Sequence, residues 1–483
     1  MNLTTSHLIA LLPLLIVSAT IIVVMLGVAW QRHHFLSATL TVVGLNAALV
    51  SLLATLTVTP IQVTPLLAFD NYSVLFMALA LIAALACTTL AHAYLEGFDD
   101  RREEYYMLLL CSVLGAMTLV ASRHLTALFI GLELMSVPLY GMAAYAYRNR
   151  VSLEAGLKYM VLSAAASAFL LFGMALLYAE AGTLEFAGLG QSLNQGGHDL
   201  WLLTGIGMMV IALGFKLSLV PFHLWTPDVY EGAPAPMSAF LATVSKLAVF
   251  ALLIRLFETA PVTDNGVLHV IIAVIAFASM IVGNLLALRQ NNIKRLLGYS
   301  SIAHLGYLLT ALVASNELAV ETVGVYMVTY VLTTLGAFGV VALVSSPYGG
   351  ADAADMSHYR GLFWRRPYLA AVMTVMMLSL AGIPLTAGFI GKFYAIAVGV
   401  QSGLWWLVAG IVVGSAIGLY YYLRVMVGLY LHEGDETRRD ATDDWGQRSG
   451  GVVVLLLAIA VLVLGIYPQP MIALIDAATM TIG

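Results

Sequence analysis

Long apolar runs recur from one end of this chain to the other, and most are long enough to span about 30 Å of hydrocarbon. Of the 483 residues, 61% are hydrophobic and only 10% are charged. A soluble domain has too little interior to bury so much apolar surface, so most of it must face lipid or other membrane helices. The sequence therefore predicts an all-α polytopic membrane protein with about 14 transmembrane helices. The predicted spans are 8–30, 36–56, 73–94, 106–122, 124–146, 155–181, 201–225, 234–258, 266–288, 295–314, 320–346, 367–400, 404–430 and 451–475.

The basic residues of the loops indicate how these spans are oriented. If both termini lie outside, most of the 21 basic residues fall in cytoplasmic loops, as the positive-inside rule requires, and the external loops carry only Arg123. No basic face accumulates, so a nucleic-acid partner is not expected. The first run lacks a basic segment before it and a cleavage site behind it, which predicts a retained helix.

Three lysines lie inside predicted spans, one or more helical turns from either end: Lys216, Lys246 and Lys392. A charge at the bilayer centre costs roughly 3 kcal/mol even on the lenient insertion scale. Each is therefore expected to be neutral, to be paired, or to serve a function that needs it. Arg255 and Arg424 lie near span ends, from where their side chains are expected to reach the interface.

Glu133 is the only carboxylate predicted to lie deep inside a span, in LFIGLELMSVPLYGM (128–142). Glu133 and Lys216 each precede a proline by five residues, so each helix is expected to loosen about one turn beyond its charge. In low dielectric a nearby glutamate favours the charged lysine, whereas desolvation favours the neutral amine. The two residues could thus form a protonation switch; a static ion pair that ties two helices together is the alternative.

Two histidines extend this set of titratable residues. His223 follows Lys216 by seven residues, about two turns along the same face of an unbroken helix, and His304 lies in LLGYSSIAHLGYLLTALV (296–313). A single histidine in a membrane helix is more often a hydrogen-bonded core residue than a relay. Lysines and histidines on successive spans, with Ser and Tyr hydroxyls beside them, instead predict a path for protons.

Two prolines predict broken helices. Pro221 and Pro384 lack an amide hydrogen, so the carbonyls of Leu217 and Leu380 are expected to lose their helical partners. The two interruptions lie five spans apart, which predicts two five-helix repeats, the second inverted, with a transport site near the midplane. The predicted divisions are N-terminal helices in 1–105, the first repeat in 106–258, the inverted repeat in 259–430, and a cytoplasmic loop with the last helix in 431–483.

Five stretches carry these titratable residues and helix breaks: LELMSVPLYG with Glu133, GFKLSLVPFHLWTPDVYEGAPAP with Lys216, TVSKLA with Lys246, NNIKRLLGYSSIAHLGY with His304, and LSLAGIPLTAGFIGKFY with Lys392. Together they resemble the antiporter-like membrane subunits of the proton-pumping NADH:quinone oxidoreductase, respiratory complex I. The resemblance covers essentially the whole chain and is greatest to subunit N. The long C-terminal extension of subunit L is lacking, and Lys392 stands where subunit M carries a glutamate.

The resemblance implies a role for each matching residue. Glu133 and Lys216 would be an ion pair whose opening and closing changes the proton affinity of the lysine. Lys246 would be the central relay, and Lys392 the exit-side or neighbour-facing proton site.

The resemblance also implies secondary positions in the proton path. His223 and His304 would bridge the lysines. Glu154 and Lys158 are four residues apart near the start of their span; they would line the access path, or simply stabilise their helix as an i,i+4 pair.

In this family electrons pass through other subunits, so this chain is expected to hold no cofactor. NADH, FMN, iron–sulfur clusters and quinone are implied for the complex. Consistent with that, we find no dinucleotide fingerprint, and the two cysteines, Cys87 and Cys111, could not ligate a cluster alone. The implied partners are other membrane subunits, including sister antiporter-like subunits, and lipid. The implied location is the bacterial inner membrane, with both termini on the periplasmic side.

Two other functions share these features. A subunit of a cation/proton antiporter would have the same fold and lysines, although one deep carboxylate is a thin supply of ligands for a sodium site. A structural spacer in a membrane complex would use its buried charges only to hold helices in register.

Overall fold

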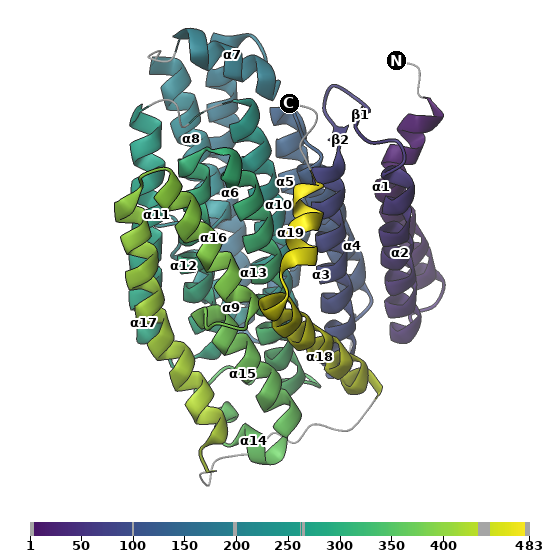
Figure 1. The fold of residues 1–483 in the computed structure, drawn as a ribbon. Helices are drawn as coiled ribbons and strands as arrows, with labels where there is room; N and C mark the ends of the chain where they lie inside the picture. Colours follow the sequence, from purple (N-terminus) through teal and green to yellow (C-terminus); the bar gives the residue numbers. More distant parts are fainter. Residues whose placement is uncertain are drawn as a thin grey trace.

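The computed structural model describes residues 4–98, 101–196, 200–260, 262, 266–432 and 445–478. Within them the chain forms a bundle of nineteen α-helices with one short hairpin (Figure 1). Most of the polar segment 433–451 lies outside the described residues. The elements are α1 (Thr5–Trp30), α2 (His34–Thr55), β1 (Ile61–Gln62), β2 (Ala68–Phe69), α3 (Asn71–Leu95), α4 (Glu104–Val120), α5 (Leu125–Ala143), α6 (Arg150–Ala181), α7 (Phe186–Gly196), α8 (Leu200–Lys216), α9 (Trp225–Gly232), α10 (Ala235–Thr259), α11 (Gly266–Leu288), α12 (Ile293–Ala314), α13 (Glu317–Val344), the 3-10 helix η2 (Met356–Tyr359), α14 (Leu362–Arg365), α15 (Pro367–Ala381), α16 (Ala387–Gln401), α17 (Trp405–Tyr430), α18 (Trp445–Ile466) and α19 (Gln469–Asp476).

Eleven of these helices are long and apolar enough to cross a membrane. Four shorter apolar helices, α4, α8, α15 and α16, add to them. The predicted all-α polytopic fold is therefore confirmed, whereas the total of about 14 spans stays a prediction. The predicted span 367–400 is two helices, α15 and α16, separated by a non-helical segment.

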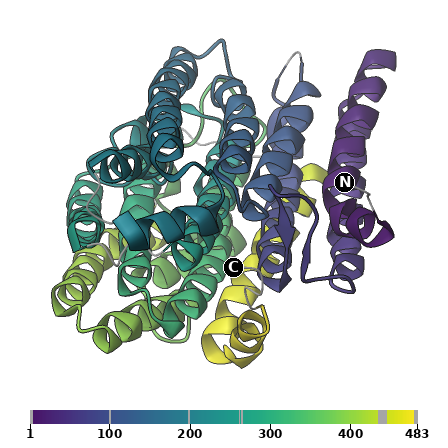
Figure 2. The same ribbon diagram turned by 90° about the horizontal axis from the view of Figure 1, so that it is seen from above.

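The middle of the bundle is formed by α10, α12 and α13. The apolar 18-residue stretches of α10 and α12 are completely buried inside the bundle, and 89% of the corresponding stretch of α13 is buried. The helices α1 and α2 form one edge of the bundle, seen from above in Figure 2. The start of α1 and the end of α19 lie at the same end of the bundle as α7, and α14 lies at the opposite end (Figure 1).

A buried ion pair joins α3 to α10. Asp70 caps α3 by accepting a hydrogen bond from the amide of Ser73, and both its oxygens accept 2.8 Å hydrogen bonds from Arg255. The two side chains are 0% and 1% exposed. The prediction that Arg255 reaches the interface is therefore wrong, because the loop before α3 brings a carboxylate to it inside the bundle.

Two other basic residues are also held by the protein. Arg424 donates hydrogen bonds to the main-chain carbonyls of Leu288 and Gln290. Lys294, which directly precedes the predicted span 295–314, is fully buried and donates to Asp352 over 2.5 Å.

Candidate functional site

The first break in the bundle begins at Lys216, where α8 ends. Ser218 adopts a left-handed backbone conformation with φ of 63°, and the chain resumes as α9 at Trp225. Pro221 lies within this segment, so the helix ends more than one turn before the proline. The predicted cause of the break was that Pro221 cannot donate to the carbonyl of Leu217. This cause is incomplete, because Leu217 itself already lies outside the helix.

Lys246, on the neighbouring helix α10, binds two residues of this break. Its ammonium donates 2.6 Å hydrogen bonds to the main-chain carbonyl of Lys216 and to the hydroxyl of Ser218. It also lies 5.0 Å from the centre of the Trp225 ring, and the Lys246 side chain is completely buried. A helix end leaves carbonyls without partners and carries a partial negative charge, so a buried amine is well placed there.

The side chain of Lys216 points to serines on two other helices. Its ammonium donates to Ser136 on α5 over 2.7 Å and to Ser163 on α6 over 2.6 Å. Ser136 in turn donates to the carbonyl of Leu132, and Ser163 accepts from Tyr140. Each serine thus makes one further hydrogen bond besides the one it accepts from the amine.

Glu133 lies close by but is held by another hydroxyl. Its carboxylate accepts a 2.5 Å hydrogen bond from Ser167, one turn beyond Ser163 on α6. Glu133 is only half-buried, whereas Lys216 is buried. The structure thus brings the two predicted partners to the same helices, with neighbouring serines holding each of them.

The second break repeats the arrangement of the first. Helix α15 ends at Ala381, Gly382 adopts φ of 81°, and α16 begins at Ala387, so Pro384 lies in the gap. Lys392 on α16 donates to the carbonyl of Ala381 over 2.9 Å. A Cβ on Gly382 would lie 2.7 Å from the Lys392 side chain, so glycine provides both the backbone conformation and the space.

A layer of hydroxyl groups surrounds His304 on α12. One ring nitrogen lies 2.8 Å from the hydroxyl of Tyr326 and the other 3.2 Å from that of Tyr422. Tyr422 also lies 2.5 Å from the hydroxyl of Ser300. The ring of Tyr307 packs against His304 and is 5.5 Å from the Lys392 ammonium, so this layer connects the histidine to the second break.

The remaining predicted relay residues occupy different surroundings. His223 is buried within the first break, and its ring makes no hydrogen bond to another side chain among the described residues. Lys158 pairs with Glu154 over 2.6 Å and with Asp228 over 2.8 Å, in a partly exposed cluster. Asp228 also accepts a hydrogen bond from Arg295, which ties α9 to α12.

The arrangement is suited to moving protons over short distances. Hydroxyl groups both donate and accept, so they can connect titratable amines, imidazole and carboxylate inside a protein. The serines and tyrosines were not singled out from the sequence, apart from those beside His304. Their one signal is spacing, since Ser136 follows Glu133 by three residues and Ser163 and Ser167 are four apart, each on one helix face.

Comparison with known proteins identifies the family of this chain. The family model for the NADH:quinone oxidoreductase/Mrp antiporter transmembrane region matches residues 122–418, more than half of the chain. The chain belongs to this NADH:quinone oxidoreductase/Mrp antiporter family. Every predicted proton-path residue lies inside the matched range, from Glu133 to Lys392.

Members of the family from bacteria resemble the chain over nearly its full length. It is 67% identical over 467 residues to the NADH-quinone oxidoreductase subunit N of Chromohalobacter salexigens, covering 97% of this chain and 98% of that protein. It is 62% identical over 482 residues to the subunit of the same name from Ectopseudomonas mendocina, covering 99% and 97%.

A solved member of the family has the same fold. A chain of respiratory complex I from Thermus thermophilus matches with a TM-score of 0.83 and 35% identity, over 96% of this chain and 99% of that chain. The resemblance to antiporter-like complex I subunits, and to subunit N among them, is thereby confirmed.

Proposed function

We propose that this chain is the proton-translocating, subunit N type membrane subunit of an NADH:quinone oxidoreductase. One observation carries the mechanism: at the first break Lys216 binds serines through its ammonium, while its carbonyl accepts a hydrogen bond from Lys246. The amine of Lys246 thus binds the backbone of the residue that carries the second buried amine, so the charge on one lysine changes the free energy of protonating the other.

Glu133 acts as the movable charge in this proposal. When its carboxylate approaches Lys216, the Coulomb attraction favours the protonated amine; when it withdraws to Ser167, desolvation favours release of the proton. One helical turn of about 6 Å separates Ser163 from Ser167. A side-chain rotation or a water molecule is enough to close that gap.

Lys246 passes the proton from the first repeat toward the second. His304 and the tyrosines around it lead to Lys392 at the second break, where the hydrogen bond to Ala381 holds the amine in place. His223 is assigned to a water-bridged step, since its buried ring makes no hydrogen bond to another side chain among the described residues.

Glu154 and Lys158 belong to the cytoplasmic access path in this proposal. They are 62% and 40% exposed on this chain, so no part of the bundle covers them completely.

The remaining assignments follow from the family. NADH, FMN, the iron–sulfur clusters and quinone are bound by partner subunits, among which sister antiporter-like subunits lie beside this chain in the bacterial inner membrane. Both termini face the periplasm, and residues 106–258 and 259–430 are the two inverted repeats. Similarity to subunit N relatives over nearly the full length favours this function over a cation/proton antiporter.

The test is a paired measurement on Lys216→Ala in the otherwise intact complex. Quinone-linked NADH oxidation and proton uptake are followed in inverted membrane vesicles, with assembly checked on native gels. We expect the complex to assemble and both rates to fall together, by tenfold or more. Lys216→Arg, which keeps the charge but hardly titrates, is expected to stay low.

The matched control is Arg150→Ala, which removes an exposed basic residue at the start of α6. It is expected to leave both rates unchanged. An assembled Lys216→Ala complex that oxidises NADH and pumps at full rate would show that Lys216 is a structural cation and would overturn the proposal.

A further inference from the structure

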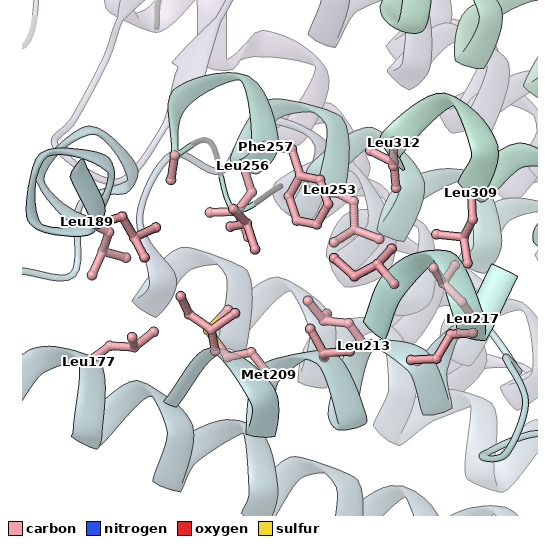
Figure 3. A pocket seen from close by; sticks show the side chains of 18 of the residues that line it. Leu177, Leu189, Met209, Leu213, Leu217, Leu253, Leu256, Phe257, Leu309 and Leu312 are labelled. Atoms are coloured by element: carbon pink, nitrogen blue, oxygen red, sulfur yellow. The ribbon is translucent and has the colours of Figure 1, made fainter. Parts of the chain in front are cut away.

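An elongated apolar slot begins beside the first break and extends toward α7 (Figure 3). Leu213 and Leu217 line one wall, and Leu253 and Leu256 of α10 line the other, facing them across the gap. The slot has about 770 Å³ of space between atoms, a figure that includes the open space at its mouth.

The lining of the slot is apolar throughout. It consists of 21 residues, every one of which is Leu, Ile, Val, Met, Phe, Ala or Gly. A quinone head group, a sugar or a peptide would lose its hydrogen bonds there and gain none in return. Water is equally disfavoured, because a buried water molecule needs two to four polar partners. The part of any occupant that lies inside the slot must therefore be apolar along its whole length.

The slot opens at the outer surface of the bundle between two helices. Val210 on α8 and Ile275 on α11 are the partly exposed lining residues along these helices. Helix α8 packs chiefly on α6, whereas α11 packs chiefly on α12 and α17, so the two helices belong to different parts of the bundle. Beside Ile275 on α11, Ile271 and Val274 point outward with about half of their surface exposed. Hydrocarbon chains of the bilayer would lie against this surface.

The far end of the slot lies at a polar boundary. Leu189 and Leu193 of α7 contribute to the lining, while Gln191 of the same helix is exposed. A short helix with one apolar face and one polar face, at the end of a membrane bundle, marks the level at which hydrocarbon gives way to head groups. A molecule with a polar head and a long apolar tail fits this gradient.

We propose that the slot binds one acyl chain of a membrane phospholipid, which enters from the bilayer between α8 and α11 with its head group near α7. The tail then ends beside Leu217, directly after Lys216 and close to the break that Lys246 closes. A bound acyl chain fills the space between α8 and α10 and keeps water away from the side of the break that faces α7.

The test uses the intact complex in phospholipid membranes doped with phosphatidylcholine that carries a photoreactive diazirine at the end of one acyl chain. After illumination, labelled peptides are mapped by mass spectrometry. We expect label on residues 206–219 and 253–260, reduced at least fivefold by excess unlabelled phosphatidylcholine. Labelling only of outward-facing residues such as Val274 would overturn the proposal, as would slot labelling that excess quinone reduces and phospholipid does not.

A filled slot provides a second readout. Leu213→Trp occupies the space with a larger apolar side chain and is expected to reduce the slot label at least fivefold, whereas Val270→Trp on the exposed face of α11 is the matched control and is expected to have no effect. Undiminished label in an assembled Leu213→Trp complex would also contradict the proposal. If that variant fails to assemble, the wild-type map and competition decide alone. Labelling requires no turnover, so its result is independent of whether Lys216 carries protons.

Discussion

The ammonium of Lys246 donates a 2.6 Å hydrogen bond to the main-chain carbonyl of Lys216, at the point where α8 ends. Lys392 makes the same kind of contact with Ala381 at the end of α15, over 2.9 Å. In each case a buried amine binds the carbonyl end of a half-helix, where partners are missing and the helix dipole is negative. The lysine and the helix break are thus one structural unit, and a change of charge on the amine acts on the helix end directly.

This contact predicts that Lys246 has two separable roles. Lys246→Met leaves the carbonyl of Lys216 and the hydroxyl of Ser218 without their donor, at a cost of about 1–3 kcal/mol per buried group. We expect a lower Tm of the purified complex and loss of proton uptake. Lys246→Gln keeps an N–H donor without a titratable amine, so we expect it to recover part of the Tm and none of the pumping.

The measurement is thermal unfolding of the complex together with proton uptake in inverted vesicles. Full pumping by Lys246→Gln would mean that the hydrogen bond to the helix end is all that this position provides.

The serines around Lys216 give a second prediction. Ser136→Ala and Ser163→Ala each remove one acceptor from the ammonium, and a single hydrogen bond to a charged group contributes roughly 1.5–3 kcal/mol. We expect each variant to lower the coupled rate of NADH oxidation at least severalfold and the double variant to lower it further. Ser18→Ala, on the peripheral helix α1, removes only a hydroxyl bonded to its own helix and serves as the control. A double variant with the wild-type rate would mean that the serines only fill space.

The positions of the buried charges could be read from the sequence because burial of a lysine in a membrane is costly and therefore rare. Lys216, Lys246 and Lys392 are all buried inside the bundle. The two broken helices were also predictable, since proline cannot donate to a helix. The residue at which each helix stops was harder to predict. Helix α8 ends at Lys216 because Ser218 takes a left-handed backbone conformation, and a serine in the sequence does not indicate such a conformation.

The hydrogen-bond partners could not be predicted, because they come from helices far apart in the sequence. A serine in a membrane helix usually donates to the carbonyl one turn back, as Ser136 does with Leu132. The presence of a serine in the sequence therefore does not predict a hydrogen bond to a second helix. Asp70 was missed for a similar reason. It lies in a loop, where a carboxylate is expected to be hydrated, yet the fold buries it against Arg255.

The Asp70–Arg255 pair predicts a large and specific effect on stability. Asp70→Asn removes the charge opposite a buried guanidinium, and breaking such a pair costs about 3–5 kcal/mol. We expect a Tm several degrees lower and less assembled complex. The double variant Asp70→Asn with Arg255→Met, which removes both charges, is expected to recover most of the loss. A double variant no better than Asp70→Asn alone would show that the two charges do not stabilise each other.

The hydroxyl of Tyr422 gives the last prediction, since it lies between Ser300 and His304. Tyr422→Phe keeps the ring and its packing but removes the hydroxyl that contacts both Ser300 and His304. If protons pass along this layer toward Lys392, proton uptake per NADH oxidised is expected to fall at least severalfold while assembly and Tm change little. Tyr430→Phe is the matched control, because this hydroxyl lies on the same helix α17 but is 2.9 Å from the hydroxyl of Thr374, away from Ser300 and His304. Equal losses in both variants would mean that the effect is on packing of α17, whereas a loss confined to Tyr422→Phe requires a path through its hydroxyl.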